Sequence, residues 1–271
     1  MKTRRLHIIF LFCLLLVSSR SLALKPQKEF LMLPDTFGLH YKTDKIIAKD
    51  KAELCIWDIA PVGKNQHNRT TIIMAYADMG NMSYYLYYAN QFAIEGFRVV
   101  MFDYRGFGCS SDFKIDENYL FYAEYVKDLD AVLAYEKKKG GFDKIGVWSS
   151  SMGTIIATLA NEKFDFLIAD SYVTNLDEVV GKIKEMKGKT MSLPVSENTY
   201  GKNIRSNEVP KLVFAGSEDF AIDRNVLNTL KNCTVIDFKG GHQKAAQVFS
   251  KNAFADDYTK KISDFLAEPN N

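Results

Sequence analysis

The 271-residue sequence is more informative at first for what it lacks. Its formal net charge is only +2, it has no arginine-rich stripe, and its cysteines and histidines do not follow the spacing of a zinc site. These absences remove the usual reasons to expect a nucleic-acid partner or a bound metal. No internal repeat and no low-complexity linker divides the chain, so we expect one domain over residues 24–271.

Long apolar runs are also scarce, and the one at the N-terminus is short. Basic residues at positions 2, 4 and 5 precede an apolar run from Leu6 to Val17, which is well short of the roughly 20 residues that span a bilayer. Small residues follow at Ser21-Leu22-Ala23. This order is typical of a cleavable signal peptide, although an uncleaved anchor is the alternative. We therefore expect residues 1–23 to be removed near Ala23 and the protein to be exported, to a periplasm or as a secreted protein.

Cysteine is too rare for a disulfide framework. Loss of the signal peptide would remove Cys13 and leave Cys55, Cys109 and Cys233. Three scattered cysteines can form at most one pair, and their positions do not choose which pair is oxidised.

Short apolar segments alternate with helical patterns along the rest of the chain. Segments around Leu39–Ala48 and Ala52–Ile59 predict an antiparallel hairpin. Further strands are predicted over residues 70–76, 98–103, 164–171, 210–216 and 234–238, and helices over 82–95, 118–138, 176–187, 223–230 and 243–266. Residues 188–208 are polar and predict an irregular segment. This order predicts an α/β fold, with a mostly parallel twisted sheet, helices on both faces and an N-terminal antiparallel hairpin.

The central prediction concerns residues 144–160. An apolar run from Lys144 to Trp148 gives way to the small residues of Ser149–Gly153, and a helix-forming run follows. The pentapeptide fits the pattern small-x-nucleophile-x-small, a variant of G-x-S-x-G. A nucleophile elbow requires this strand–turn–helix context, which would place Ser151 at the head of the helix. The alternative is an ordinary serine-rich helix cap.

Two further polar residues follow strands on the same side of the predicted sheet. Asp219 comes after the strand at 210–215, and His242 comes after the last strand. Functional groups gather beyond the carboxyl ends of the strands in an open parallel sheet, so both should lie near Ser151. Elimination favours His242, because the other histidines fall in the signal peptide, the hairpin and a polar loop: His7, His40 and His67.

These three side chains suit nucleophilic catalysis. A serine hydroxyl is a weak nucleophile that needs an adjacent base, and imidazole titrates near neutral pH. A carboxylate holds the ring in the useful tautomer and stabilises the imidazolium. We therefore predict that Ser151 is the nucleophile, His242 the base and Asp219 the orienting acid. Three other carboxylates could serve as the acid, but loop position favours Asp219 over them: Glu218, Asp223 and Asp170.

At this point the chain resembles the α/β-hydrolase superfamily over almost its whole mature length. The resemblance rests on motifs at Asp78–Ser83, Phe102–Gly108, Ser149–Gly153, Gly216–Asp219 and Gly241-His242. It is greatest to capless members, the depalmitoylase-like and acylglycerol-lipase-like serine hydrolases, whose loop is similar to Asp103–Gly108. The resemblance implies an open cleft, since the polar segment 188–208 is too short for a full cap.

One departure from that family concerns the oxyanion hole, for which the aligned backbone donors are Asp78 and Met152. Family members usually carry His-Gly and a neutral residue where this chain has Tyr76-Ala77-Asp78. A carboxylate about 4 Å from an oxyanion would repel it by on the order of 4 kcal/mol at an effective dielectric near 20. That repulsion could cancel the roughly 3–4 kcal/mol that one oxyanion donor contributes. Asp78 must therefore point away, pair with a cation such as Arg105, serve a different substrate, or merely cap the next helix.

The sequence thus predicts an exported serine hydrolase that cleaves a carboxylic ester or thioester through an acyl-enzyme. Its partner would be a small-molecule or acyl substrate, and the chemistry implies no cofactor. Two alternatives remain open. One is a serine peptidase with the same triad. The other is a non-catalytic scaffold that binds a ligand or partner, and the unusual Asp78 is the reason to consider it.

Overall fold

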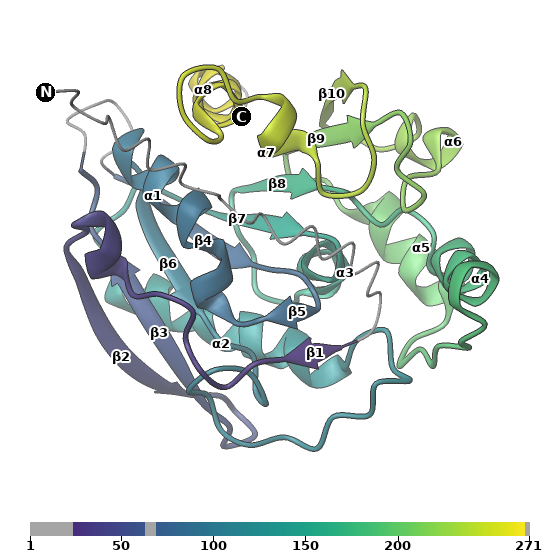
Figure 1. Ribbon diagram of the computed structural model, residues 1–271, viewed down its shortest axis with the longest axis horizontal. Helices are drawn as coiled ribbons and strands as arrows, with labels where there is room; N and C mark the ends of the chain where they lie inside the picture. The colour runs from purple at the N-terminus through teal and green to yellow at the C-terminus, as the bar shows by residue number, and fades with distance from the viewer. Residues whose placement is uncertain (1–23, 63–68, 269–271) are drawn as a thin grey trace, which may run out of the picture.

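The computed structural model describes residues 24–62 and 69–268. The predicted signal peptide lies outside these residues. The described chain forms one large sheet covered by helices, with a small two-stranded sheet beside it (Figure 1). This arrangement confirms the predicted fold class.

The large sheet has eight strands in the order β10-β9-β8-β7-β4-β6-β3-β2. Apart from β3, which is antiparallel to both of its neighbours, the strands pair in parallel. The β2–β3 pair confirms the predicted hairpin. The strands are β2 (Tyr41–Ile47), β3 (Glu53–Ile59), β4 (Thr70–Ala75), β6 (Arg98–Phe102), β7 (Lys144–Ser150), β8 (Phe166–Asp170), β9 (Lys211–Gly216) and β10 (Cys233–Phe238).

Helices cover both faces of the sheet. On one face α1 (Leu86–Ile94) contacts α8 (Asp256–Ala267), and on the other α3 (Met152–Leu159) contacts both α2 (Ala123–Lys139) and α5 (Glu197–Ser206). The remaining helical segments are η1 (Pro34–Phe37), η2 (Met82–Tyr85), α4 (Leu176–Lys187), α6 (Arg224–Leu227) and α7 (Ala245–Val248).

The central strands carry the hydrophobic core. All six residues of β4 are buried, as expected for a strand covered on both faces. Trp148 of β7 is fully buried, packs on Tyr88 of α1 and donates a hydrogen bond to the Tyr258 hydroxyl of α8 over 2.8 Å. This packing holds the carboxyl end of β7, and the turn that follows it, in a fixed place.

Two predictions about the C-terminal half were wrong. Residues 188–208 are not wholly irregular, because α5 forms there with Ser196 as its N-cap and buries Tyr200 and Ile204. The single terminal helix predicted over 243–266 is instead two helices, α7 and α8. Ala255 adopts a left-handed conformation (φ 61°) between them, and the Asp256 carboxylate accepts the backbone N–H groups of the preceding turn.

Two predictions about the N-terminal half also need correction. Helix α2 begins at Ala123 rather than near Asn118, because residues 118–120 pair instead with Ser192, whose carbonyl accepts the Leu120 N–H over 3.1 Å. The lead-in predicted to be irregular contains β1 (Lys25–Pro26), which pairs in parallel with β5 (Met79–Gly80). This pairing attaches the start of the described chain to the loop that carries Asp78.

Candidate active site

The turn after β7 has the backbone geometry of an elbow. Ser151 lies between the last residue of β7 and the first residue of α3, with φ 49° and ψ −116°. This is a strained conformation for a residue with a side chain. Only a small residue fits two positions later, because a Cβ on Gly153 would lie 1.8 Å from the Ala75 carbonyl oxygen. The structure thus gives a steric reason for the small-x-Ser-x-small pattern.

The structure brings Ser151, His242 and Asp219 together. His242 Nε2 lies 2.9 Å from Ser151 Oγ, and His242 Nδ1 lies 2.8 Å from Asp219 Oδ1. The Ser151 residue is 5% exposed and the Asp219 side chain is fully buried, whereas the His242 ring keeps 16% of its surface exposed. A reacting group could therefore approach the serine and the imidazole from one side, while the acid is kept from water.

The electrostatics of Asp219 favour its ionised form. Burial opposes ionisation, but the hydrogen bond with His242, the charge of that ring and the Ala221 N–H together outweigh it and lower the pKa of Asp219. A carboxylate in this state can hold the Nδ1 proton and leave Nε2 free to accept a proton from Ser151.

Backbone and side-chain contacts hold the histidine loop against the elbow. The Gln243 backbone N–H donates to Ser171 Oγ over 2.6 Å, and the Gln243 side-chain amide donates to Ser150 Oγ over 2.9 Å. Gln243 itself has a positive φ of 57°. Sequence reasoning did not single out this residue, although its place directly after His242 was a usable signal.

The rival acids occupy other places. Glu218 is exposed, and Asp223 caps α6 by accepting the Asn225 N–H over 2.8 Å. Asp170 is buried at the end of β8 and makes no hydrogen bond to His242 among the described contacts. Of these carboxylates within the described residues, only Asp219 forms a hydrogen bond with the His242 ring.

The loop that faces the elbow is held in place by Asp103. Its carboxylate accepts the Tyr76 hydroxyl over 3.0 Å and the Met82 N–H over 2.7 Å, on either side of Asp78. Asp78 and Met152, the two predicted oxyanion donors, both line the pocket around Ser151.

Arg105 is not the partner of Asp78 that the sequence suggested. Its guanidinium binds Asp50 and Asp128 through four hydrogen bonds of 2.6–2.9 Å. The Asp78 carboxylate instead acts on Lys187 of α4. Burial, the larger effect, lowers the pKa of Lys187, and the charge of Asp78 partly opposes this.

The pocket beside Ser151 is small and mainly apolar. Its cavity volume is only about 10 Å³, about the space that a single water molecule needs. Its polar lining comes from Asp78, Ser151 and His242. Its apolar lining comes from Leu120, Met152, Ile155, Val173, Val179, Phe220 and Ala221.

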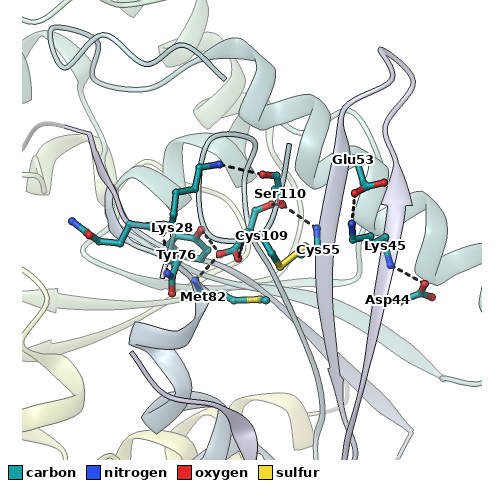
Figure 2. Close-up of a disulfide and its surroundings, with 12 residues drawn as sticks. Lys28, Asp44, Lys45, Glu53, Cys55, Tyr76, Met82, Cys109 and Ser110 are labelled. Carbon is teal, nitrogen blue, oxygen red and sulfur yellow. Dashed lines mark hydrogen bonds and ion pairs between the residues drawn. A yellow bond between two sulfur atoms is a disulfide. The ribbon is translucent and has the colours of Figure 1, made fainter. Parts of the chain in front are cut away.

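A disulfide joins Cys55 of β3 to Cys109 in the loop after β6, with the Cα atoms 5.7 Å apart (Figure 2). The same loop is bound by Ser110, whose Oγ accepts the Cys55 N–H over 2.9 Å and donates to the Asp103 carbonyl oxygen over 2.6 Å. Cys233 is a free thiol. The structure therefore chooses one of the three pairings that the sequence left open.

Within residues 24–62 and 69–268, no cluster of three or more histidine, cysteine, aspartate or glutamate side chains has the arrangement of a metal site. Within the same residues, no helix is both long enough and apolar enough to cross a membrane.

Comparisons with known proteins agree on the fold. A family model described as the alpha/beta hydrolase fold matches residues 72–176. A curated relative, an uncharacterized membrane protein of Saccharomyces cerevisiae, is 24% identical over 194 residues. The match spans 69% of this chain and 65% of the yeast protein, which is less than two thirds of its length.

Solved structures cover more of the chain. The Pyrococcus furiosus esterase Pf2001 is 19% identical with a TM-score of 0.68, over 90% of this chain and 96% of that one. The alpha/beta hydrolase GrgF of Penicillium sp. is 17% identical with a TM-score of 0.58, over 84% and 98%. A lidless serine hydrolase of Xanthomonas campestris is 15% identical with a TM-score of 0.54, over 75% and 86%. The chain has the α/β-hydrolase fold.

Proposed function

We propose that this protein is a serine hydrolase that cleaves carboxylic ester or thioester bonds through an acyl-enzyme. The observation that carries the proposal is the continuous chain of contacts from Ser151 Oγ through the His242 ring to Asp219, with distances of 2.9 and 2.8 Å. Its position at a strained elbow supports the same reaction, as does the mainly apolar lining beside Ser151, which an acyl chain could contact.

In the acylation step, Ser151 Oγ attacks the carbonyl carbon of the substrate while His242 Nε2 takes the hydroxyl proton. Asp219 stabilises the imidazolium that forms. The carbonyl oxygen becomes an oxyanion, for which the N–H groups of Asp78 and Met152 are the proposed donors. When the tetrahedral intermediate collapses, His242 gives its proton to the leaving alcohol or thiol, and the acyl group remains on Ser151.

In the deacylation step, His242 takes a proton from water, and the resulting nucleophile attacks the acyl carbon. Collapse of the second intermediate returns the proton to Ser151 and releases a carboxylic acid. Each step moves one proton through His242 and needs no electron transfer. The proposed reaction therefore calls for no cofactor.

The proposed substrate is a small or narrow acyl compound in an open cleft. The lining of the pocket is mainly apolar, and two of the similar solved structures are named as an esterase and as a serine hydrolase without a lid. These features support placement near the capless depalmitoylase-like and acylglycerol-lipase-like enzymes. Profiling alkyl esters and thioesters of increasing acyl length tests this placement, with short chains expected to react fastest.

A fluorophosphonate probe tests the reaction class directly. Wild type should be labelled covalently, and Ser151→Ala should not. Ser206→Ala, which alters an exposed serine of α5, should be labelled like wild type. Absence of labelling in well-folded wild type would overturn the proposal.

Two other functions use the same observations. A serine peptidase would have the same triad, and would be recognised by cleavage of peptide amides at rates comparable to esters. A ligand-binding scaffold is favoured by one feature, the presence of Asp78 in the pocket lining. A scaffold would bind ligands without being labelled by the probe.

Export is proposed on two grounds. The first is the N-terminal pattern of residues 1–23, and the second is the Cys55–Cys109 disulfide, since disulfides persist in oxidising compartments. Expression of the full chain in its native host, followed by N-terminal sequencing of the mature protein, tests this. The expected N-terminus is Leu24, and an intact Met1 in the cell interior would contradict it.

A further inference from the structure

Asp170 is a buried acid beside the elbow that the proposed reaction does not use. It ends β8, is 1% exposed, and neither of its carboxyl oxygens has a hydrogen-bond partner within the described part of the chain. Its backbone carbonyl accepts the Ser151 N–H over 3.2 Å, so the residue is tied to the elbow itself. A buried carboxyl without donors is costly, which makes its place here unusual.

The groups that face Asp170 come from four other parts of the fold. Asp219 and His242 act on it from the loops after β9 and β10. Asp170 also acts on Tyr88 of α1 and Tyr258 of α8, where burial together with the charge of Asp170 keeps both phenols neutral by raising their pKa. The neighbouring Ser171 hydroxyl lowers the pKa of Asp170 and Asp219, but its geometry to Asp170 falls short of a hydrogen bond.

We propose that Asp170 is a second, buried acid behind the Asp219–His242 pair, and that it acts as a positioning residue whose charge state sets the basicity of His242. This role rests on the proposed function. It follows from the place of a buried carboxyl without donors at the end of β8. The Asp170 carbonyl accepts the Ser151 N–H, and the next residue, Ser171, accepts the N–H of Gln243 beside His242.

The physical reason is mutual coupling. Burial and the negative charge of Asp219 raise the pKa of Asp170 to about 7, while the charge on His242 acts in the opposite direction. Asp170 therefore keeps its proton at mildly acid pH and loses it near neutral pH. By linkage, an ionised Asp170 raises the proton affinity of His242 by as much as protonated His242 lowers that of Asp170. The two groups lose their protons in two coupled steps.

The direct test is an NMR titration of the His242 ring in the purified protein, assigned with His242→Gln. In Asp170→Asn the pKa of His242 should fall by about half a unit or more, because a neighbouring charge typically moves a pKa by 1–3 units when fully present. The matched control is Asp165→Asn. Asp165 directly precedes β8, at the end of the strand opposite to Asp170, and its carboxylate accepts the Ile145 N–H. This variant should leave the His242 titration unchanged.

Kinetics provide the second readout. The acid limb of the kcat/KM profile on a neutral p-nitrophenyl ester should move to lower pH in Asp170→Asn and reduce to a single ionisation, with KM nearly unchanged. A merely structural role would lower activity at every pH without moving the limb. That result, with an unmoved His242 titration, overturns the inference while leaving the proposed hydrolase intact.

The two proposals can fail separately. A shifted His242 titration in a protein that no fluorophosphonate labels would support the coupling and overturn the hydrolase. If Asp170→Asn does not fold, the carboxyl carbons of ¹³C-labelled aspartate in wild type replace it. One buried carboxyl should titrate near neutral pH in step with His242. Burial also raises the pKa of Asp103 and Asp128 to about 6, but their signals should titrate independently of His242. The absence of any buried aspartate that titrates in step with His242 would overturn the inference.

Discussion

Backbone strain is concentrated around the candidate histidine. Ser151, Ser171 and Gln243 all have positive φ angles, of 49°, 60° and 57°. Conformations of this kind cost of order 1–3 kcal/mol each and persist only where neighbouring contacts over-determine them. Here Ser171 Oγ accepts the Gln243 N–H, and the Asp170 carbonyl accepts the Ser151 N–H. These two hydrogen bonds hold the strained residues in place, as expected where catalytic side chains must be positioned.

Gly153 provides a test of the elbow at the scale of one methyl group. A Cβ at this position would clash with the backbone carbonyl of Ala75, which could move only at a large cost in free energy. We expect Gly153→Ala to lower the free energy of unfolding by about 3 kcal/mol and to reduce ester turnover. Gly181→Ala in α4 should do the opposite and stabilise by about 0.5–1 kcal/mol, because nothing lies within 4 Å of its added Cβ. Urea unfolding measures both, and equal effects would contradict the steric account.

Asp78 is the second residue whose role can be tested by a small change. Asp78 lines the pocket, and its charge acts on Lys187 of α4, which should reduce its repulsion of an oxyanion. We expect Asp78→Asn to change p-nitrophenyl acetate turnover by about tenfold or less, a factor worth 1.36 kcal/mol. Asp177→Asn, at the exposed start of α4, serves as the control. A much larger rise in Asp78→Asn would show that the carboxylate faces the reacting oxygen.

At the scale of helices and strands, the sequence predicted what hydrophobic periodicity encodes. The strands of the large sheet and the bounds of α4 were predicted because continuous apolar runs and an amphipathic pattern are local signals. The same logic located Ser151, Asp219 and His242, since each follows a strand. Helix α5 was missed because only Tyr200 and Ile204 carry its buried face, in an otherwise polar segment.

Other features could not be predicted because they depend on contacts between distant segments. The start of α2 is set by pairing with Ser192, and the break before α8 is set by the Asp256 carboxylate. The isolation of Asp170 depends on which donors the fold leaves out of reach. Periodicity carries none of this information.

The Cys55–Cys109 disulfide joins β3 to the loop after β6, and its contribution to stability can be measured. The cysteines are 54 residues apart, so the closed loop should contribute about 4 kcal/mol to the free energy of unfolding in the chain-entropy model. We expect Cys55→Ala/Cys109→Ala and reduced wild type to lose similar stability in urea unfolding. Cys233→Ala alters the free thiol and should stay within about 1 kcal/mol of wild type. Identical unfolding of oxidised and reduced wild type would contradict this.

Across the whole molecule, buried charge is distributed unevenly. Arg105 binds Asp50 and Asp128, and this network attaches the hairpin to α2. Asp103 and Asp170 are equally buried but have no ion-pair partner within the described residues. At Asp103, burial outweighs three hydrogen-bond donors and raises the pKa to about 6. At Asp170, burial raises the pKa to about 7. The native state therefore binds protons at pH values where the unfolded chain has released them.

The sign of the resulting pH dependence follows from linkage. An acid whose pKa is raised in the native state lowers stability as pH rises from its unfolded value, near 4, to its folded value. For Asp170 the free energy of unfolding should fall by about 1.4 kcal/mol per pH unit between about pH 5 and 6.5. Asp170→Asn removes this contribution, so its urea-derived stability should fall less steeply than that of wild type over the same range. Parallel curves for the two proteins would show that Asp170 is already ionised in the folded state at pH 5, and that the fold supplies a donor to its carboxylate.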